Sequence, residues 1–416
     1  MRQVSGFSYM HLGEEADPAT DVVCKYRVTT DLPMEKAAEA IAAEQSTGTW
    51  TGISTLTEST LENYGARVLA IEGDLVTIAF PDVDFSIEVG GIPQILSVVS
   101  GNLYGLEALK AVRFEDIQFP RSITSMYKGP RFGADGLRKI LGRPEKPLIG
   151  TIVKPKIGLS PKETAGYVYE AGAGGLTNSK DDETLVDQRF CPMQERTAAV
   201  AESLDRLAGE GQKMIHAINI STNGDKILEV ADRAQSWGAK QLMVDVITCG
   251  FGAVQALAED PSVKVPVHVH RTMHGAMTKN PEHGIAMLPM VKLIRMCGGD
   301  ALHIGTLGAG KMSGDIKGDH DNLDACLDPS SPYRTVMPVC SGGVYPGMLE
   351  KMVRSSGLNV QIQAGGGVAG HPGGVRSGAM AMSQAVNAIY NKVPLKEYAK
   401  NHKELAQALE KWGLKE

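Results

Sequence analysis

Cysteine is scarce in this 416-residue chain, and no two of its six cysteines form a CxxC pair. Scattered thiols of this kind favour neither a disulfide framework nor a thiolate zinc site. They indicate reduced cysteines inside a cell.

The chain also has little that would bind a membrane or a nucleic acid. It contains no run of about 18 apolar residues, the length that a membrane-spanning helix needs, and its first twelve residues lack the apolar core of a signal peptide. The formal net charge is -6, which gives no reason to expect a nucleic-acid partner. We therefore expect a cytoplasmic protein.

The first third of the sequence predicts a small α+β domain. Single hydrophobic cores stop growing at about 250 to 300 residues, so a chain of this length should form two domains. The patterns of apolar residues predict a βαββαβ order, which is that of a ferredoxin-like sandwich. Its elements are a strand over 22–28, a helix over 33–44, a hairpin over 66–79, a helix over 93–105 and a strand over 110–119. A Gly/Pro-rich connection at 127–146 follows, and we expect domains over 1–130 and 131–416.

The rest of the chain predicts a (β/α)₈ barrel, also called a TIM barrel. Short apolar runs alternate with helical stretches such as 192–208 and 280–296, and the shortest helix is expected over 319–327. The eight candidate strands cover 147–155, 174–180, 213–221, 239–246, 265–272, 301–307, 336–343 and 360–367. A doubly wound sheet is the weaker alternative, because no dinucleotide-type glycine fingerprint follows the first strand.

The most informative strand end is Lys180-Asp-Asp-Glu183. Strand alternation points Lys180 and Asp182 the same way, and Glu183 at the tip can turn toward them. Carboxylates suit Mg²⁺, and a lysine carbamylated by CO₂ would add a third anionic oxygen donor. For the tetrapeptide alone, a lysine paired with carboxylates on a solvated loop is the better interpretation. The position at the end of a barrel strand favours the metal site instead.

Other strand ends indicate an anionic substrate. Ser341-Gly342-Gly343 and the glycines at 365–367 can point backbone N–H groups at a phosphate, although they could also serve tight turns. Arg271 and His303 favour a second phosphate. His268 and His270 form an HxH pair that could bind zinc, but this pair is a weak signal by itself. The segment 305–314 is interpreted either as a mobile lid carrying Lys311 or as a plain flexible loop.

At these residues the sequence resembles the large subunits of ribulose-bisphosphate carboxylase/oxygenase (RuBisCO), most of all the archaeal-type form III group. The resemblance runs from about Asp21 to the C-terminus. The matching motifs are EQSTGTW (44–50), GNLYG (101–105), GTIVKPK (150–156), GGLTNSKDDE (174–183), HRTMH (270–274), GKMSG (310–314) and SGG (341–343).

The resemblance implies Mg²⁺-dependent carboxylation, and oxygenation, of ribulose 1,5-bisphosphate through an enediolate to 3-phosphoglycerate. Carbamylated Lys180 would bind Mg²⁺ with Asp182 and Glu183 and would take the C3 proton. Lys154 would protonate the final carbanion, and Lys311 would polarise CO₂. The other implied substrate contacts are Lys156, His270, Arg271, His303, Ser341, Gly342, Gly343, Gly365 and Gly366 from the barrel, and Glu44, Thr49, Trp50 and Asn102 from the N-terminal domain.

In the family, the N-terminal residues reach the active site of a neighbouring subunit, which implies a head-to-tail homodimer or a larger assembly of dimers. The sequence departs from the family pattern at Ile152, at Thr177-Asn178-Ser179 and in a shortened stretch after Lys311. These departures bear on lid closure, CO₂/O₂ selectivity and rate more than on reaction type. Three alternatives remain: a RuBisCO-like protein acting on another sugar phosphate, a zinc hydrolase, and a catalytically silent sugar-phosphate-binding barrel.

Overall fold

The computed structural model describes residues 8–49, 51–143, 145–310 and 315–415, which form two compact units. The first unit contains residues up to Lys128 together with Met273–Leu293, and the second contains Gly129–Thr272 and Ile294 onward. None of the described helices is both long enough and apolar enough to cross a membrane.

The first unit is built on a five-stranded mixed sheet. In chain order its main elements are β1 (Asp21–Thr29), α1 (Met34–Glu44), α2 (Glu58–Tyr64), β2 (Arg67–Glu72), β3 (Leu75–Pro81), α3 (Gly91–Ser100) and β4 (Ala111–Gln118). The strand order β10-β4-β1-β3-β2 contains the antiparallel βαββαβ arrangement expected from the sequence. The short helix α2 was not predicted.

The fifth strand of this sheet comes from far along the chain. β10 (Gly284–Ile285) pairs in parallel with β4, and the backbone N–H of Ala286 donates to the carbonyl of Phe114 at 2.8 Å. The prediction of one helix over 280–296 was therefore wrong over its first seven residues: the helix α12 covers Met287–Cys297. Pairing with a distant strand, which periodicity cannot detect, overrides the helical pattern here.

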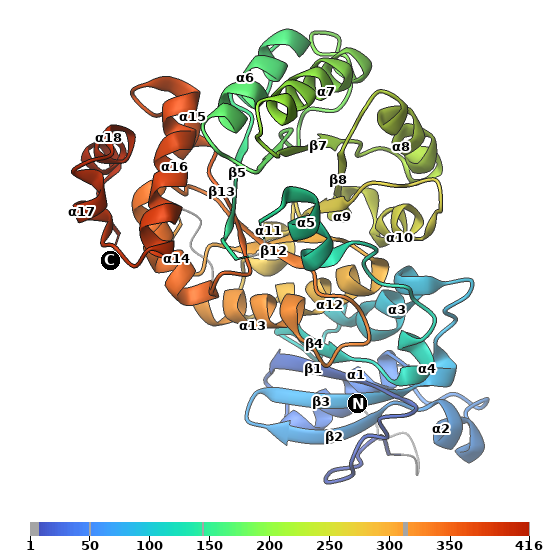
Figure 1. The fold of residues 1–416 in the computed structure, drawn as a ribbon. Helices are drawn as coiled ribbons and strands as arrows, with labels where there is room; N and C mark the ends of the chain where they lie inside the picture. The colour runs from blue at the N-terminus through green and yellow to red at the C-terminus, as the bar shows by residue number, and fades with distance from the viewer. Residues whose placement is uncertain (1–7, 50, 144, 311–314, 416) are drawn as a thin grey trace. The chain divides into compact units, whose positions relative to one another are not determined.

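The second unit is a closed barrel of eight parallel strands, as predicted (Figure 1). The strands are β5 (Leu148–Ile152), β6 (Asn178–Lys180), β7 (Ile215–Asn219), β8 (Gln241–Asp245), β9 (Val267–His270), β11 (Ala301–Gly305), β12 (Met337–Ser341) and β13 (Gln361–Gln363). Each lies within its predicted range but is shorter than predicted.

Helices surround this barrel (Figure 1). They include α6 (Pro161–Ala173), α7 (Met193–Gly209), α8 (Ile227–Ser236), α9 (Val246–Cys249), α10 (Phe251–Glu259), α13 (Ile316–Leu327), α14 (Leu349–Ser356), α15 (Gly366–Ala369) and α16 (Gly374–Tyr390). The predicted short helix after the sixth strand is α13, which begins three residues earlier than expected because Asp315 caps its first turn by accepting from the N–H of Lys317.

The amino end of the barrel is covered by helix α5 (Gly133–Leu141). Ala134, Leu137 and Leu141 on its apolar face form one buried cluster with the first residues of four strands. These residues are Leu148 of β5, Ile215 of β7, Ala301 of β11 and Met337 of β12. The hydrophobic core thus fills the amino end, while polar side chains lie at the carboxyl end.

Candidate functional site

Lys180, Asp182 and Glu183 lie together at the carboxyl end of β6. The Nζ atom of Lys180 is 3.6 Å from Oε2 of Glu183, and both Lys180 and Asp182 are only 1% exposed. β6 is three residues long, so the chain leaves the ladder at Lys180 and is free to turn Glu183 toward it. Two carboxylates and one amine therefore share a small, largely buried volume.

Lysines from the end of the neighbouring strand β5 neutralise these carboxylates. Nζ of Lys154 lies 2.8 Å from Oδ2 of Asp182, and Nζ of Lys156 lies 3.6 Å from Oε1 of Glu183. β5 and β6 are paired in parallel, with Ile152 opposite Lys180, so their carboxyl ends meet at one level. A Cβ atom on Gly365, at the end of β13, would lie 3.0 Å from Cε of Lys154, so the absence of a side chain there makes room for the lysine.

Burial and neighbouring charges shift the pKa values of Lys180 and Glu183. Burial lowers the pKa of Lys180, and the attraction of Glu183 and Asp182 offsets this only in part. Burial raises the pKa of Glu183, but Lys180 and His270 outweigh it, and the net pKa is about 2. At neutral pH the site therefore holds an ionised Glu183 beside a lysine whose neutral amine forms more easily than that of a surface lysine.

His270 faces the same carboxylate from β9. Its Nδ1 lies 3.0 Å from Oδ1 of Asp245, and its Nε2 lies 3.7 Å from Oε2 of Glu183. Burial is the main cause that lowers the pKa of His270. Because a carboxylate can only accept, Asp245 fixes the proton of the neutral ring on Nδ1, and Nε2 is then an acceptor directed into the site.

A second chain of polar groups crosses the barrel from β9 to β12. Nε2 of His268 lies 2.8 Å from Nε2 of His303, and Nδ1 of His303 lies 2.8 Å from Oγ of Ser341. Burial lowers the pKa of both histidines well below the usual value, so both rings are neutral. His268 thus pairs with His303 while His270 pairs with Asp245, and no group of three His, Cys, Asp or Glu side chains among the described residues is arranged to hold a metal ion.

The predicted anion-binding residues lie in or just after four neighbouring strands, β9, β11, β12 and β13. Burial lowers the pKa of Arg271 to about 10, and the guanidinium still remains charged at neutral pH. Gly342 and Gly343 both have positive φ (115° and 73°), a conformation that places the backbone of this turn where other residues would be strained. A Cβ on Gly366 would meet nothing within 4 Å, so its backbone borders open space.

The predicted residues of the N-terminal domain belong to the first unit, where Nδ2 of Asn102 donates to Oε1 of Glu44 at 3.3 Å. Thr49 belongs to the same unit. Trp50 and Lys311 lie outside the described residues.

Sequence reasoning missed several residues around the site. Asp245 ends β8 and could have been found by the rule that singled out the other strand ends. Asp181, within the Lys180–Glu183 run, points away from the carboxylate pair and contacts Arg196 and His216, both fully buried. No local pattern marks Arg196, because its partners are distant along the chain.

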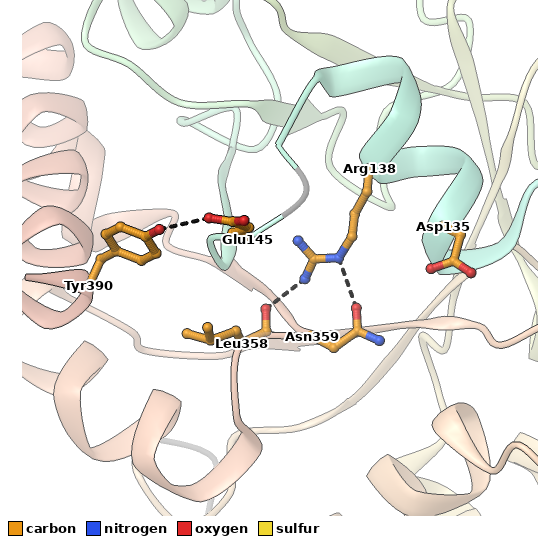
Figure 2. A pocket seen from close by; sticks show the side chains of 6 residues that line it. All are labelled: Asp135, Arg138, Glu145, Leu358, Asn359 and Tyr390. Atoms are coloured by element: carbon orange, nitrogen blue, oxygen red, sulfur yellow. Dashed lines mark hydrogen bonds between the residues drawn. The ribbon is translucent and has the colours of Figure 1, made fainter.

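A separate cavity of about 520 Å³ is lined by Asp135, Arg138, Glu145, Leu358, Asn359 and Tyr390. Figure 2 shows Arg138 directed toward Asn359 and the carbonyl of Leu358, and Tyr390 directed toward Glu145. The guanidinium of Arg138 also donates to the carbonyls of Arg143 and Lys146. Its donors are engaged in holding loops at the amino end of the barrel, so this cavity offers little to an anionic ligand.

Comparison with known proteins places both parts of the chain in one protein family. The family profile described as "Ribulose bisphosphate carboxylase large chain, catalytic domain" matches residues 133–412, and that of the N-terminal domain matches residues 8–123. The chain is 39% identical to the ribulose bisphosphate carboxylase of Methanocaldococcus jannaschii, over 91% of this chain and 94% of the other.

Two solved archaeal structures are similar over almost the whole chain. The octameric RuBisCO of Pyrococcus horikoshii has a TM-score of 0.91 at 36% identity, covering 98% of this chain and 97% of that one. The dimeric archaeal RuBisCO of Hyperthermus butylicus has a TM-score of 0.88 at 34% identity, covering 97% and 98%.

Proposed function

The chain belongs to the ribulose bisphosphate carboxylase large-chain family and is a ribulose bisphosphate carboxylase, and from this premise we propose that the carboxyl end of the barrel around Lys180 is its active site. The observation that carries the proposal is the convergence of Lys180, Asp182 and Glu183 with Lys154 and His270. Cations and carboxylates kept this close, and largely buried, are typical of a functional site.

Lys180, Asp182 and Glu183 are proposed to hold Mg²⁺. Asp182 and Glu183 supply hard anionic oxygens, and the buried amine of Lys180, whose pKa is lowered, can add to CO₂ and lose a proton to become an anionic carbamate. The donor set therefore fits the ion once CO₂ has reacted. Bound Mg²⁺ supplies Lewis acidity and holds the reacting oxygens together.

Proton transfers are assigned to the chain's own groups. Carbamylated Lys180 accepts the proton from C3 of ribulose 1,5-bisphosphate, which starts enolisation. After CO₂ is added at C2, water adds to the C3 carbonyl and the C2–C3 bond is cleaved, so that C3 leaves as a carboxylate; Nζ of Lys154 then donates a proton to the C2 carbanion, with Lys156 beside it. Nε2 of His270, an acceptor in the neutral ring, orients a substrate hydroxyl. Lys311 is proposed to polarise CO₂.

The two phosphates are assigned to opposite parts of the strand ends. Arg271 and His303 bind one, and Gly365 and Gly366, with Thr49 and Trp50, bind the other. Ser341, Gly342 and Gly343 contact the substrate between them. The positive charge of Arg271 and the unobstructed backbone at Gly366 support this assignment.

A homodimer, alone or within a larger assembly, is part of the proposal. Glu44, Thr49, Trp50 and Asn102 would complete the active site of a neighbouring subunit. The RuBisCO of Pyrococcus horikoshii is octameric and that of Hyperthermus butylicus is dimeric, which supports an assembly of this kind. We also propose a cytoplasmic location, consistent with six cysteines that are all unpaired.

The experiment has to separate this proposal from three alternatives, the first being a member of the family that enolises, isomerises or decarboxylates another sugar phosphate. The decisive experiment incubates the purified chain with Mg²⁺, labelled bicarbonate and ribulose 1,5-bisphosphate and measures labelled 3-phosphoglycerate. Labelled product supports the proposal. An isomer alone would favour the alternative, and bound but unchanged substrate would favour a silent barrel. A zinc hydrolase would be indifferent to preincubation with CO₂.

A further inference from the structure

Behind the proposed metal site lies a fully buried polar chain of four side chains: Ser179, His216, Asp181 and Arg196. Each is at most 1% exposed. Oγ of Ser179 lies 2.7 Å from Nδ1 of His216, and Nε2 of His216 lies 3.1 Å from Oδ1 of Asp181. Nε of Arg196, on α7, donates to Oδ2 of Asp181 at 3.1 Å.

This row of hydrogen-bonded side chains lies on one face of segment 179–182. The proposed metal ligands Lys180 and Asp182 lie on the opposite face. Successive residues of a strand point to opposite sides, so Ser179 and Asp181 face the surrounding helices while Lys180 and Asp182 face the inside of the barrel. Fixing Ser179 and Asp181 therefore fixes the backbone from which Lys180 and Asp182 project.

Asp181 is held through all of its polar atoms. Its N–H donates to the carbonyl of Ala217 at 3.0 Å, and Oδ2 also accepts from the N–H of Asn219 at 3.0 Å. Its own carbonyl accepts from Nζ of Lys180 at 2.9 Å. The residue thus links the neighbouring strand β7 directly to the amine that is proposed to react with CO₂.

Arg196 extends the same anchor to the loop after the site. Its guanidinium donates to the carbonyl of Cys191 at 2.9 Å and to that of Val186 at 2.6 Å, in addition to Asp181. One side chain therefore joins the strand end at 181 to the connection that leads into α7. A pair of charges this deeply buried contributes little net stability compared with apolar side chains of similar size, so a role in specifying geometry is the better explanation.

We propose that Ser179, His216, Asp181 and Arg196 are positioning residues that hold Lys180 and Asp182 in the arrangement needed for CO₂-dependent binding of a divalent cation. The inference rests on the proposed function of Lys180. It also accounts for Ser179, one of the departures from the family pattern, as a member of this hydrogen-bonded chain.

His216 offers a specific test, because one ring nitrogen donates a hydrogen bond to one partner and the other nitrogen accepts one from a second partner. The Asp181 carboxylate accepts from Nε2, and with the proton on Nε2 of a neutral ring, Nδ1 accepts from the Ser179 hydroxyl. Glutamine offers one donor and one acceptor at the end of a side chain and can bridge both partners, whereas methionine fills the space without bridging them. His216→Gln and His216→Met are therefore a matched pair.

The experiment measures binding of Mn²⁺, as a paramagnetic probe, to the full-length wild-type and variant chains, with and without bicarbonate. Metal affinity typically falls about 10- to 100-fold when groups that orient metal ligands are removed. We expect His216→Met to weaken bicarbonate-dependent Mn²⁺ binding at least about tenfold and His216→Gln to retain most of it. Equal affinity of folded His216→Met and wild type would overturn the proposal, and so would equal losses in the two variants.

Ser179→Ala keeps the test decisive if His216→Met fails to fold, because it removes only the terminal hydroxyl. It should weaken bicarbonate-dependent binding about threefold or more, while Ser356→Ala, which removes another buried hydroxyl on α14, should leave it unchanged. Unchanged binding in Ser179→Ala would then refute the inference. If wild type itself shows no bicarbonate-dependent binding, the proposed function fails as well, whereas wild-type binding with unaffected variants removes only the positioning role.

Discussion

Lys154 and Asp182 form a direct ion pair, in which Nζ of Lys154 lies 2.8 Å from Oδ2 of Asp182. The lysine side chain is 28% exposed and the carboxylate only 1%, so the lysine has room to move and the carboxylate does not. Since Asp182 is a proposed Mg²⁺ ligand, the ammonium group and the metal ion compete for the same oxygen.

Replacing Lys154 by Met should separate metal binding from catalysis. The competing ammonium group disappears, so bicarbonate-dependent Mn²⁺ binding should be as tight as in wild type or tighter. Formation of 3-phosphoglycerate should fall at least about 100-fold, because the proposed proton donor to the carbanion is lost. Lys162→Met, which removes an exposed lysine at the start of α6, is the control. Weaker Mn²⁺ binding in Lys154→Met would mean that Lys154 holds Asp182 in place for the metal.

Lys180→Met should abolish carboxylation and remove the effect of bicarbonate on Mn²⁺ affinity, since no amine remains to react with CO₂. The protein should fold normally, because Met fills the buried site without a polar amine. Lys146→Met is a suitable control: Lys146 donates to Asn387 and takes no part in the proposed site. Titration of Mn²⁺ with and without bicarbonate, beside a radiolabel assay, tests both expectations. A Lys180→Met variant with full activity would refute the carbamate assignment.

Asp84→Asn should stabilise the protein at neutral pH. Burial raises the pKa of Asp84 to about 6, and its Oδ2 is buried without a hydrogen-bond partner among the described residues. A raised carboxyl pKa means that the folded state binds the proton more tightly than the unfolded state. The stability that this tighter proton binding gives is fully present below pH about 4 and is lost as the pH rises through 6.

The gain at pH 7 should be about 1 kcal/mol, less than the full shift implies, because Asp84 is partly exposed to solvent. Denaturant unfolding at pH 4 and pH 7 measures it. The difference in unfolding free energy between variant and wild type should be larger at pH 7. The same difference at both pH values would show that the Asp84 carboxyl group does not titrate between them.

Leu137→Ala should destabilise the barrel by about 2–5 kcal/mol, because Leu137 is completely buried in the cluster at the amino end. Ile140→Ala on the same helix should cost under about 1 kcal/mol, because Ile140 is 38% exposed. Denaturant unfolding of both variants gives the comparison. Similar losses in the two variants would mean that burial of Leu137 in the cluster is not what α5 contributes to stability.

Much of the fold could be predicted because the spacing of apolar residues within short stretches of sequence indicates each helix or strand. Most barrel strands lie in apolar runs separated by amphipathic helices. Glu183 was expected to turn back from the strand tip toward Lys180, and the two side chains lie 3.6 Å apart. The helix predicted over 280–296 failed at its start because the strand partner of residues 284–285 lies more than 150 residues earlier. Arg196 and His216 were missed for the same reason: their role depends on Asp181, which comes from a different element.

The packing of α5 against the first residues of β5, β7, β11 and β12 bears on how substrates enter and products leave the barrel. Because side chains fill the amino end, the barrel is closed at that end and open only at its carboxyl end. At the active site proposed for the carboxyl end, the sugar phosphate, CO₂ and the products would then all pass through that end of the barrel. Any group that covers the carboxyl end would then affect substrate entry and product release together.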